Sequence, residues 1–407
     1  MKSLASPTIA NNGPLYWLAL GTFAVGTEGF MIAGLLPSMA KDLSVSVATA
    51  GQLVTVFAFA YALSSPVLTA LTGNFNRRNL LILSMTAFAL ANVVAWAAQG
   101  YWSLMGARIL LAFAAGLYVP GANALASAVV APERRGTAIA IVNGGLSISV
   151  AFGVPLGALI GDRLGWRTTF ACVAALSIVA TISLLAGLPR NIGSGLSTAS
   201  LKERIKTASQ PIILLTLLVT TLWAMGSYAI YTYLALFVAK ATHVHGAQIG
   251  FILFMWGVAA AIGLAISGRA VDKFGTRTVV VPALAILAAT FVSLSLSAYF
   301  LSQSLAIIPI VIAVIAWGIA HWGFYPGQQS ELVGIAGVKA APIVLSLNAS
   351  FMYMGFSLGA GLGSMTLTFS SVANLGFVGA ACEVAALALT LAIGKRFTGI
   401  RRIASAM

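Results

Sequence analysis

The chain has 407 residues, of which 60% are hydrophobic and only 7% are charged. Soluble domains carry roughly 25% charged residues, so this composition excludes an ordinary soluble protein and indicates a chain that crosses a membrane many times. The formal net charge of +14 would favour nucleic-acid binding in a soluble protein, but here the placement of the charges along the chain points to membrane topology instead.

Apolar runs between charged or Gly- and Pro-rich breaks predict twelve membrane-spanning helices. Their approximate limits are 15–36, 49–72, 79–98, 103–129, 138–161, 168–188, 211–238, 247–267, 277–299, 304–325, 342–368 and 373–394. The longest polar stretch, 189–210, lies between the sixth and seventh spans. It predicts a cytoplasmic linker between an N-terminal six-helix bundle at 1–188 and a C-terminal six-helix bundle at 211–407.

Lys and Arg residues are unequally divided between the two sides of the predicted membrane. If the N-terminus is cytoplasmic, seventeen of the 22 fall in inside segments, four fall outside, and Arg108 lies within the fourth span. The positive-inside rule then places both termini in the cytoplasm. The first apolar run follows no recognisable cleavage site, so we expect a retained span rather than a signal peptide.

One carboxylate, Glu28, interrupts the otherwise uncharged first span. A carboxylate inside a membrane commonly costs about 2.5–3.5 kcal/mol, so such a group tends to face water, a partner charge or a substrate. Glu28 lies roughly 20 Å from the inner face at about 1.5 Å per residue, and Arg108 reaches a similar depth from the other side. If their two helices are neighbours, Glu28 and Arg108 form an intramembrane pair. That pair would be either a static link between helices or a carboxylate whose proton occupancy changes.

The later spans carry further polar and aromatic candidates. Tyr228 and Tyr231 are three residues apart in the seventh span and can share a face, which suits a cavity for amphipathic molecules. His321, next to Trp322, has an imidazole that ordinarily titrates at about pH 6.5 and could take part in proton-linked switching or simply pack. Glu383, in the twelfth span, is interpreted as a structural acid.

Two buried amides, Asn123 and Asn348, could bond a substrate or hold helices together. The thiols Cys172 and Cys382 lie in apolar spans and are interpreted as buried. His243 and His245, in an outer loop, are a weak metal signal, and we expect neither a metal nor a cofactor.

Similar segments recur after 199 residues. The first span ends at Lys41 and the seventh at Lys240, and the loop at 69–78 is matched by the loop at 268–277. Together with later matches in the same order, these pairs indicate an internal duplication of six helices. Under this offset Ser227 takes the place of Glu28, so the carboxylate is not duplicated.

Several motifs carry a family resemblance that covers nearly the whole chain. They are GRAVDKFGTR (268–277), the arginine motif LMGARILLAFAAG around Arg108, PERRGTA (132–138), GVPLG (153–157) and GTEGFMIAGLLP in the first span. With these motifs the chain resembles the major facilitator superfamily, and within it the twelve-span drug:proton antiporters that include bacterial sugar-efflux and arabinose-efflux-like permeases.

The resemblance implies an all-α membrane protein of two pseudo-symmetric six-helix bundles, with spans one, four, seven and ten around a central cavity. It also implies conformational-switch loops. The second loop keeps the expected Asp272, Lys273, Gly275 and Arg277. The resemblance implies that these loops hold the two halves together on the cytoplasmic side. The first loop keeps Arg77 and Arg78 but has Gly73 and Asn74 where Asp and Arg are expected, so this contact is not implied for the first half.

The function implied is proton-coupled efflux of a small organic molecule (a drug, a sugar or a metabolite) from a bacterial cell, across the inner membrane and by alternating access. Glu28 and Arg108 would couple the proton, and Tyr228, Tyr231, His321, Trp322, Asn123 and Asn348 are the candidates for substrate binding. The expected partners are the substrate, protons and the lipid bilayer, without nucleic acid, and we expect a monomer.

Two rival functions remain open. An importer or facilitator could use the same fold, and a non-transporting membrane sensor or scaffold would belong to another class. An enzyme is not expected, because the chain has no Walker-type GxxxxGK[ST], no soluble domain and no recognisable Ser/His/Asp constellation. The sequence does not identify the substrate.

Overall fold

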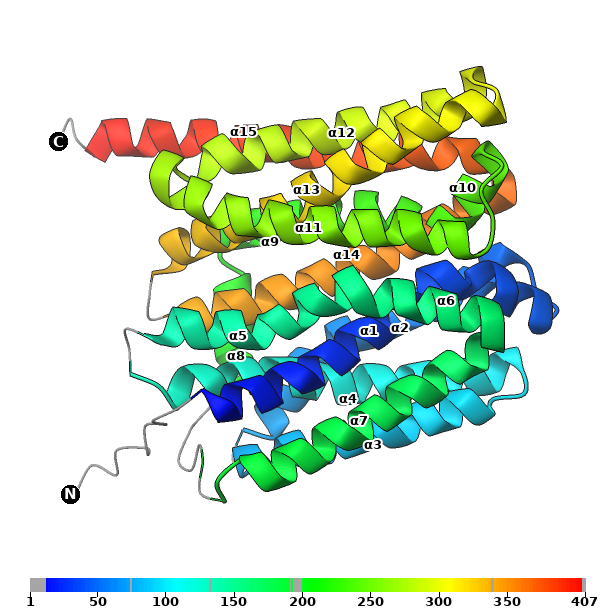
Figure 1. Cartoon of the computed structure of the whole chain (residues 1–407). Helices are drawn as coiled ribbons and strands as arrows, with labels where there is room; N and C mark the ends of the chain where they lie inside the picture. The colour runs from blue at the N-terminus through cyan, green and yellow to red at the C-terminus, as the bar shows by residue number, and fades with distance from the viewer. Residues whose placement is uncertain are drawn as a thin grey trace, which may run out of the picture. The chain divides into compact units, whose positions relative to one another are not determined.

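The computed structural model describes residues 12–73, 75–131, 134–190, 192, 200–337 and 340–404, and in these ranges every element of regular secondary structure is a helix (Figure 1). Within these ranges, twelve helical segments are long and apolar enough to cross a membrane, which is the number that the sequence predicts. The α-helices are α1 (Gly13–Asp42), α2 (Val47–Leu71), α3 (Arg77–Ala97), α4 (Tyr101–Ala128), α5 (Arg135–Ile148), α6 (Val154–Leu164), α7 (Trp166–Gly187), α8 (Leu201–Ala208), α9 (Pro211–Tyr231), α10 (Leu234–Ala241), α11 (Ala247–Phe274), α12 (Thr276–Phe300), α13 (Gln303–Ala336), α14 (Ala341–Phe369) and α15 (Leu375–Ala404).

Two of the helices begin at side-chain caps. Ser46 accepts a hydrogen bond from the amide of Thr49 at the start of α2, and Asn76 accepts one from Asn79 at the start of α3. Gly275 has φ +85° in the tight turn between α11 and α12, a conformation that favours glycine. This turn contains the motif residues expected in the second conserved loop.

The chain divides into two compact units, Met1–Leu201 with Gly246–Gly257, and Lys202–His245 with Val258–Met407. In the first unit α1 packs against α5, α6 and α7, and α3 packs against α4 and α7. In the second unit α9 packs against α14 and α15, and α12 packs against α13 and α15. These are the same pairs of spans in each unit, which is the packing expected of a duplicated six-helix bundle.

Two predicted spans are less regular than the sequence indicates. The span expected at 211–238 ends as α9 at Tyr231 and resumes as α10 at Leu234, and the Tyr233 hydroxyl donates to the Ala360 carbonyl of α14 at 2.9 Å. The span expected at 138–161 contains a π-helical turn, η2 (Ser149–Gly153), between α5 and α6. Such turns are rare and are often found beside functional sites.

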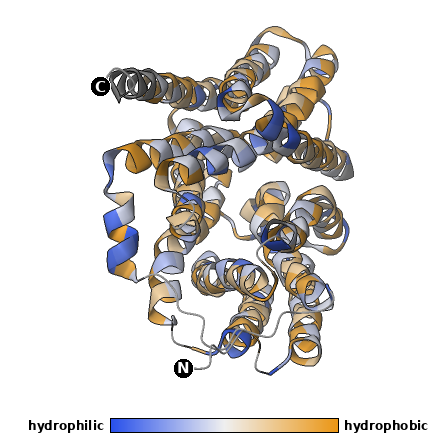
Figure 2. Cartoon of the chain, turned by 90° about the vertical axis from the view of Figure 1, so that its left-hand side faces the viewer, coloured by the Kyte–Doolittle hydropathy of each residue, from blue (hydrophilic) through white to orange (hydrophobic). Residues whose placement is uncertain are grey.

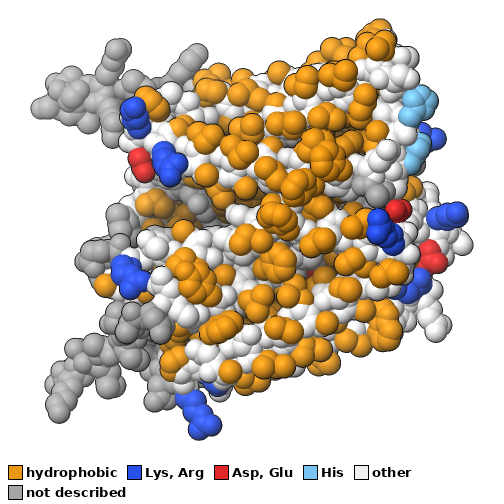
Figure 3. All heavy atoms as spheres, in the orientation of Figure 1, with side chains coloured by type: hydrophobic (Ala, Val, Ile, Leu, Met, Phe, Trp, Pro, Cys, Tyr) orange, Lys and Arg blue, Asp and Glu red, His pale blue; other side chains and the backbone are white. Residues whose placement is uncertain are grey.

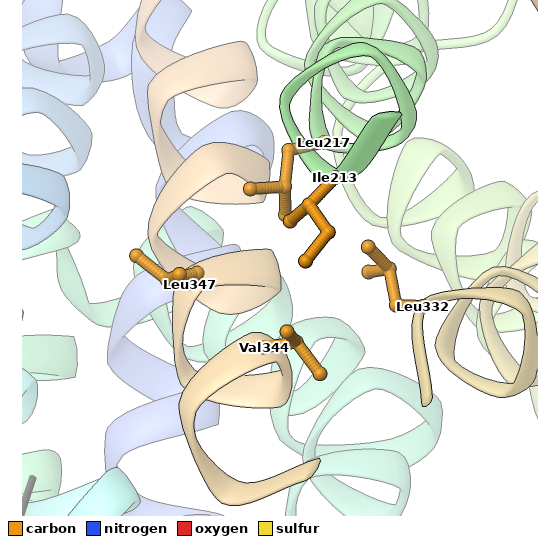
Figure 4. Close-up of a cluster of buried hydrophobic side chains, with 5 residues drawn as sticks. All are labelled: Ile213, Leu217, Leu332, Val344 and Leu347. Atoms are coloured by element: carbon orange, nitrogen blue, oxygen red, sulfur yellow. The ribbon is translucent and has the colours of Figure 1, made fainter. Parts of the chain in front are cut away.

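Small residues let paired spans approach closely. A Cβ atom at Gly359 of α14 would collide with the Met225 carbonyl of α9. Near one end of α9 and α14, a buried apolar cluster joins these two helices to α13 (Figure 4). The cluster consists of Ile213, Leu217, Leu332, Val344 and Leu347. Close backbone approach and apolar packing of this kind hold helices together where lipid surrounds them.

The outer faces of the helices are apolar. Figure 2 shows hydrophobic residues along most of the long helices and hydrophilic residues mainly in short helical and connecting segments. On the face seen in Figure 3, Lys, Arg, Asp and Glu side chains lie near helix ends and hydrophobic side chains cover the lengths between them. Cys172 of α7 is exposed on such a face, so the prediction that both thiols are buried is wrong for Cys172 and holds for Cys382.

The second half of the predicted linker forms a short helix. α8 begins at Leu201, while residues 193–199 lie outside the described part of the chain. Arg204 of α8 is buried and donates from Nη1 to the Ser346 hydroxyl of α14 at 2.6 Å. α8 is therefore anchored on the second unit by a charged side chain.

Candidate functional site

Glu28 of α1 and Arg108 of α4 form a buried ion pair in the first unit. Both side chains are 0% exposed, and Arg108 Nη1 donates to Glu28 Oε1. Helix α2 completes the surroundings of the guanidinium. Arg108 Nε donates to the Leu53 carbonyl at 3.3 Å, and the guanidinium carbon lies 4.1 Å from the centre of the Phe57 ring. The structure thus brings together the two charges whose depths matched in the sequence.

The state of this pair follows from its chemistry. An arginine guanidinium stays protonated in proteins, so Arg108 presents a permanent positive charge to the Glu28 carboxyl. The second carboxylate oxygen, Oε2, has no hydrogen-bond partner among the described residues. A buried pair is stable only while both charges are present, because the loss of one leaves the other uncompensated. Protonation of Glu28 would therefore weaken the link between α1 and α4.

The irregular turn of span five lies directly against this part of α1. A Cβ atom at Gly153 would collide with the side chain of Thr27, which precedes Glu28, and a Cβ atom at Gly26 would collide with the Ser149 hydroxyl. Both contacts join α1 to η2 within one turn of the buried carboxylate. A rearrangement of the ion pair would therefore change the contacts of α1 with the π-helical turn, where backbone hydrogen bonding is already irregular.

The aromatic residues expected in span seven gather inside the second unit. Tyr228 and Tyr231 of α9 are buried, and their ring centroids are 5.3 Å apart. Tyr228 stacks on Phe356 of α14 at 3.6 Å, and Tyr231 meets Trp317 of α13 edge-on at 6.2 Å. In this conformation the two rings fill space between helices.

His321 of α13 has a partner that sequence reasoning missed. Its Nδ1 lies 2.8 Å from the hydroxyl of Ser227 in α9, which in turn donates to Glu383 Oε1 of α15 at 3.4 Å. Trp223 stacks on the imidazole with ring centroids 4.2 Å apart. Trp322 is half-buried and meets Tyr325 edge-on at 6.1 Å. The only feature of the sequence that singled out Ser227 as a possible site residue is the repeat offset, which matches it with Glu28.

The two candidate amides make contacts between helices. Asn348 of α14 accepts a hydrogen bond from Thr220 of α9 at 2.6 Å, and Gln328 of α13 donates to Thr220 at 2.9 Å. Asn123 of α4 donates to Asn143 of α5 at 3.0 Å. Both amides thus link helices within their own units, and Oδ1 of Asn123 has no hydrogen-bond partner in the described structure.

The switch-loop residues of the two units differ in their surroundings. Asp272, Lys273 and Arg277 are exposed beside the Gly275 turn, and none of them is in an ion pair within the described ranges.

In the first unit, by contrast, Arg77 is buried and donates to the Gly73 carbonyl. Arg78 donates to the carbonyls of Leu188 and Leu185 at the end of α7, at 2.8 and 2.7 Å. These arginines satisfy carbonyls at helix ends. Asn74 lies outside the described residues.

A second ion pair lies at the far end of α1. Arg167 of α7 donates to Asp42 Oδ2 and to the Ala98 carbonyl at the end of α3, and it stacks over the Trp166 ring. Both charged side chains are partly exposed, at 32% and 46%. In the parts of the chain that the structure describes, no cluster of His, Cys, Asp and Glu could hold a metal ion.

The helical architecture and the buried charge pair are those of a multi-pass membrane transporter, and comparison with known proteins agrees. The family model described as Major Facilitator Superfamily matches residues 18–360. The "Uncharacterized MFS-type transporter YbcL" of Bacillus subtilis is 31% identical over 385 residues, covering 95% of this chain and 96% of that protein. The "Inner membrane transport protein YdhP" of Escherichia coli is 30% identical over 384 residues, covering 93% and 95%. The "Chloramphenicol resistance protein" of Streptomyces lividans is 32% identical over 286 residues, covering 68% and 73%.

Solved structures share the fold at low sequence identity. A crystal structure of the nucleoside transporter NupG has a TM-score of 0.72 at 14% identity, covering 94% of this chain and 100% of that one. A crystal structure of the peptide transporter POT in complex with alafosfalin has a TM-score of 0.76 at 13% identity, covering 96% of both. The chain belongs to the Major Facilitator Superfamily. It is a secondary transporter and not an enzyme.

Proposed function

We propose that the protein is a proton-coupled efflux transporter, in which Glu28 exchanges a proton and Arg108 controls that exchange. The supporting observation is the fully buried Glu28–Arg108 pair with a carboxylate oxygen that has no partner in the described structure. Intramembrane ionisable residues of this kind commonly mark ion or substrate pathways.

The proposed cycle uses the two states of this pair. With Glu28 ionised, Arg108 joins α4 to α1, as the hydrogen bond between them indicates. When Glu28 takes up a proton, the carboxyl loses its charge and Arg108 keeps the Leu53 carbonyl and the Phe57 ring as partners. Ionised and protonated Glu28 therefore favour different packing of α1 and α4. A transporter that binds substrate in one of these packing states and releases it in the other would couple substrate movement to proton movement.

Substrate, direction and topology belong to the same proposal. A relative named for chloramphenicol resistance supports efflux of a small organic molecule such as a drug, with sugars and other metabolites as further candidates. The relative named as an inner membrane protein and the excess of Lys and Arg on one side support a bacterial inner membrane with both termini cytoplasmic. The two halves at 1–188 and 211–407 would move about the linker at 189–210.

The remaining candidate residues take supporting roles in this proposal. The candidates for contact with the substrate are Tyr228, Tyr231, His321, Trp322 and Asn348 of the second unit and Asn123 of the first. The loop residues Asp272, Lys273, Gly275 and Arg277, with Arg77 and Arg78, would control the change of conformation.

Transport into everted membrane vesicles tests the proposal. A thermal-shift screen of antibiotics, sugars and nucleosides on the purified protein first selects the compound to be followed. Its accumulation is then measured across an imposed pH gradient. Glu28→Gln should abolish accumulation driven by the gradient, while Glu28→Asp should retain part of it. Asp42→Asn is the matched control, because it makes the same chemical change at an exposed ion pair of the same helix.

Each rival function predicts a different outcome. Full accumulation by Glu28→Gln would refute the coupling role. Counterflow of the compound that is insensitive to the gradient would favour a facilitator, and accumulation in right-side-out vesicles would favour an importer. A sensor or scaffold predicts no transport by the parent protein of any compound that it binds.

A further inference from the structure

The second unit contains a buried carboxyl that the proposed coupling does not use. Glu383 of α15 is 0% exposed, and its Oε1 accepts a hydrogen bond from Ser227 of α9. Its other oxygen, Oε2, has no hydrogen-bond partner among the described residues. The ion pairs of the described structure join Arg108 with Glu28 and Arg167 with Asp42, so neither gives Glu383 a cation.

This carboxyl is held against the backbone of α9. A Cβ atom at Gly226 would lie only 2.9 Å from Glu383 Oε1 and 2.7 Å from the Gly379 carbonyl of α15. Glycine at this position is what allows the carboxyl to reach the neighbouring Ser227. The arrangement therefore depends on close packing of α9 and α15 and is not a chance approach of two flexible side chains.

The Ser227 hydroxyl connects Glu383 to an imidazole. Ser227 Oγ lies 3.4 Å from Glu383 Oε1 and 2.8 Å from His321 Nδ1. A hydroxyl has one hydrogen to donate and can also accept, so the chain can run in either direction. In one direction His321 donates to Ser227 and Ser227 donates to an ionised Glu383. In the other, a protonated Glu383 donates to Ser227 and Ser227 donates to His321.

The other titratable groups around the carboxyl are few. The Cys382 thiol precedes it in α15. Tyr231, one turn beyond Ser227 in α9, is directed to Trp317 of α13. From α12, Phe291 lies against Gly379 and is not titratable. On the imidazole side, Trp223 stacks on His321 and offers a π-face that stabilises a positive charge.

The same two spans carry the buried polar link in each unit. In the first unit the link joins α1 with α4, and in the second it joins their counterparts α9 and α13. The position that holds Glu28 in α1 holds Ser227 in α9. The carboxyl of the second link is supplied instead by α15.

We propose that Glu383 is a second, reversible proton-binding site, connected through the Ser227 hydroxyl to His321. The proton moves from the Glu383 carboxyl to Ser227 Oγ while the hydroxyl proton of Ser227 moves to His321 Nδ1. The products are a carboxylate and an imidazolium, so no other reactant is needed. The importance of this site for transport rests on the proposed proton-coupled function, but the site itself can be measured without transport.

Infrared difference spectroscopy of the purified parent protein between buffers of different pH tests the proposal. A protonated buried carboxyl has a C=O stretching band that disappears when the proton leaves. We expect a reversible band that is absent in Glu383→Gln and retained in Glu28→Gln. Ser227→Ala keeps the carboxyl but removes its donor, and should move the midpoint of the band by about one pH unit, a tenfold change in proton affinity. His321→Gln should also move the midpoint.

Two results would overturn the proposal. One is a carboxyl band whose titration is the same in Glu383→Gln as in the parent. The other is a Glu383 band that is present at every pH, because the residue would then be a permanent structural acid. If Glu383→Gln does not fold, the Ser227→Ala variant provides the test, because an unchanged midpoint of the carboxyl band in that variant would overturn the proposal. Full gradient-driven transport by Glu28→Gln would overturn the proposed function but not the Glu383 site, so the two proposals can fail separately.

Discussion

Removing one charge of the Glu28–Arg108 pair should strongly destabilise the fold of the first unit. In Glu28→Leu the buried guanidinium keeps the Leu53 carbonyl and the Phe57 ring but loses its counter-charge. Breaking a buried pair in this way typically costs about 3–5 kcal/mol, since an uncompensated charge remains. Arg108→Met should cost a similar amount, because it leaves the Glu28 carboxylate without its cation.

Two further variants make the magnitude specific. Glu28→Gln retains an amide oxygen that can accept from Arg108, and a hydrogen bond to a charged group is worth about 1.5–3 kcal/mol, so its cost should fall to about 2 kcal/mol. The double variant Glu28→Leu with Arg108→Met has no buried charge. It should be within about 1 kcal/mol of the parent, because an apolar replacement of a whole buried pair is often close to neutral.

Equilibrium unfolding of the purified protein in mixed detergent micelles, followed by far-ultraviolet circular dichroism, measures these differences. If each charge compensates the other, the double variant is more stable than either single variant. A double variant whose loss of stability equals the sum of the two single losses would show that the charges do not depend on each other. The ion pair could then not serve as a switch.

Three smaller predictions concern other parts of the structure. Asp42→Asn breaks the partly exposed pair with Arg167 and should cost at most about 1 kcal/mol, an effect that high salt should reduce, as thermal unfolding at two salt concentrations would show. Gly359→Ala pushes α14 away from α9 and should cost about 1–3 kcal/mol, whereas Gly106→Ala, which meets nothing within 4 Å, should be close to neutral in the same unfolding assay. Arg78→Ala removes two hydrogen bonds to carbonyls at the end of α7 and should increase amide hydrogen exchange there more than elsewhere.

The sequence predicted the spans and the first charge pair because both depend on simple distances. The length of an apolar run determines whether it can cross a bilayer. The rise of about 1.5 Å per residue then gives Glu28 and Arg108 similar depths. The prediction of a pair needed only the further expectation that spans one and four are neighbours. The coupling role of the pair stays a prediction.

Other features depend on the rotation of each helix about its axis, which depth does not reveal. The sequence places Glu383 in the twelfth span but does not say which face of the helix carries it, and in the structure its carboxyl turns inward to Ser227. The interpretation of Glu383 as a structural acid stays a prediction. Cys172 was expected to be buried because its span is apolar, but in a membrane protein an apolar residue faces either lipid or protein.

The irregular turns were also not visible in the sequence. The interruption of span seven between Tyr231 and Leu234 contains neither glycine nor proline. The hydrogen bond from Tyr233 to Ala360 belongs to tertiary packing, which local propensity does not describe. The π-helical turn of span five lies just before Pro155. A proline in a helix indicates a kink but not the form that the kink takes.

The central claim is that Glu28 exchanges a proton when substrate binds. Proton release on addition of the compound selected by the thermal-shift screen can be followed with a pH indicator in weakly buffered detergent solution of the purified protein. We predict that the parent protein releases protons when the compound is added and that Asp42→Asn releases the same number. Glu28→Gln should release fewer protons, because it lacks the carboxyl of Glu28. Proton release of equal size in Glu28→Gln and the parent, at equal occupancy of the compound, would contradict the account.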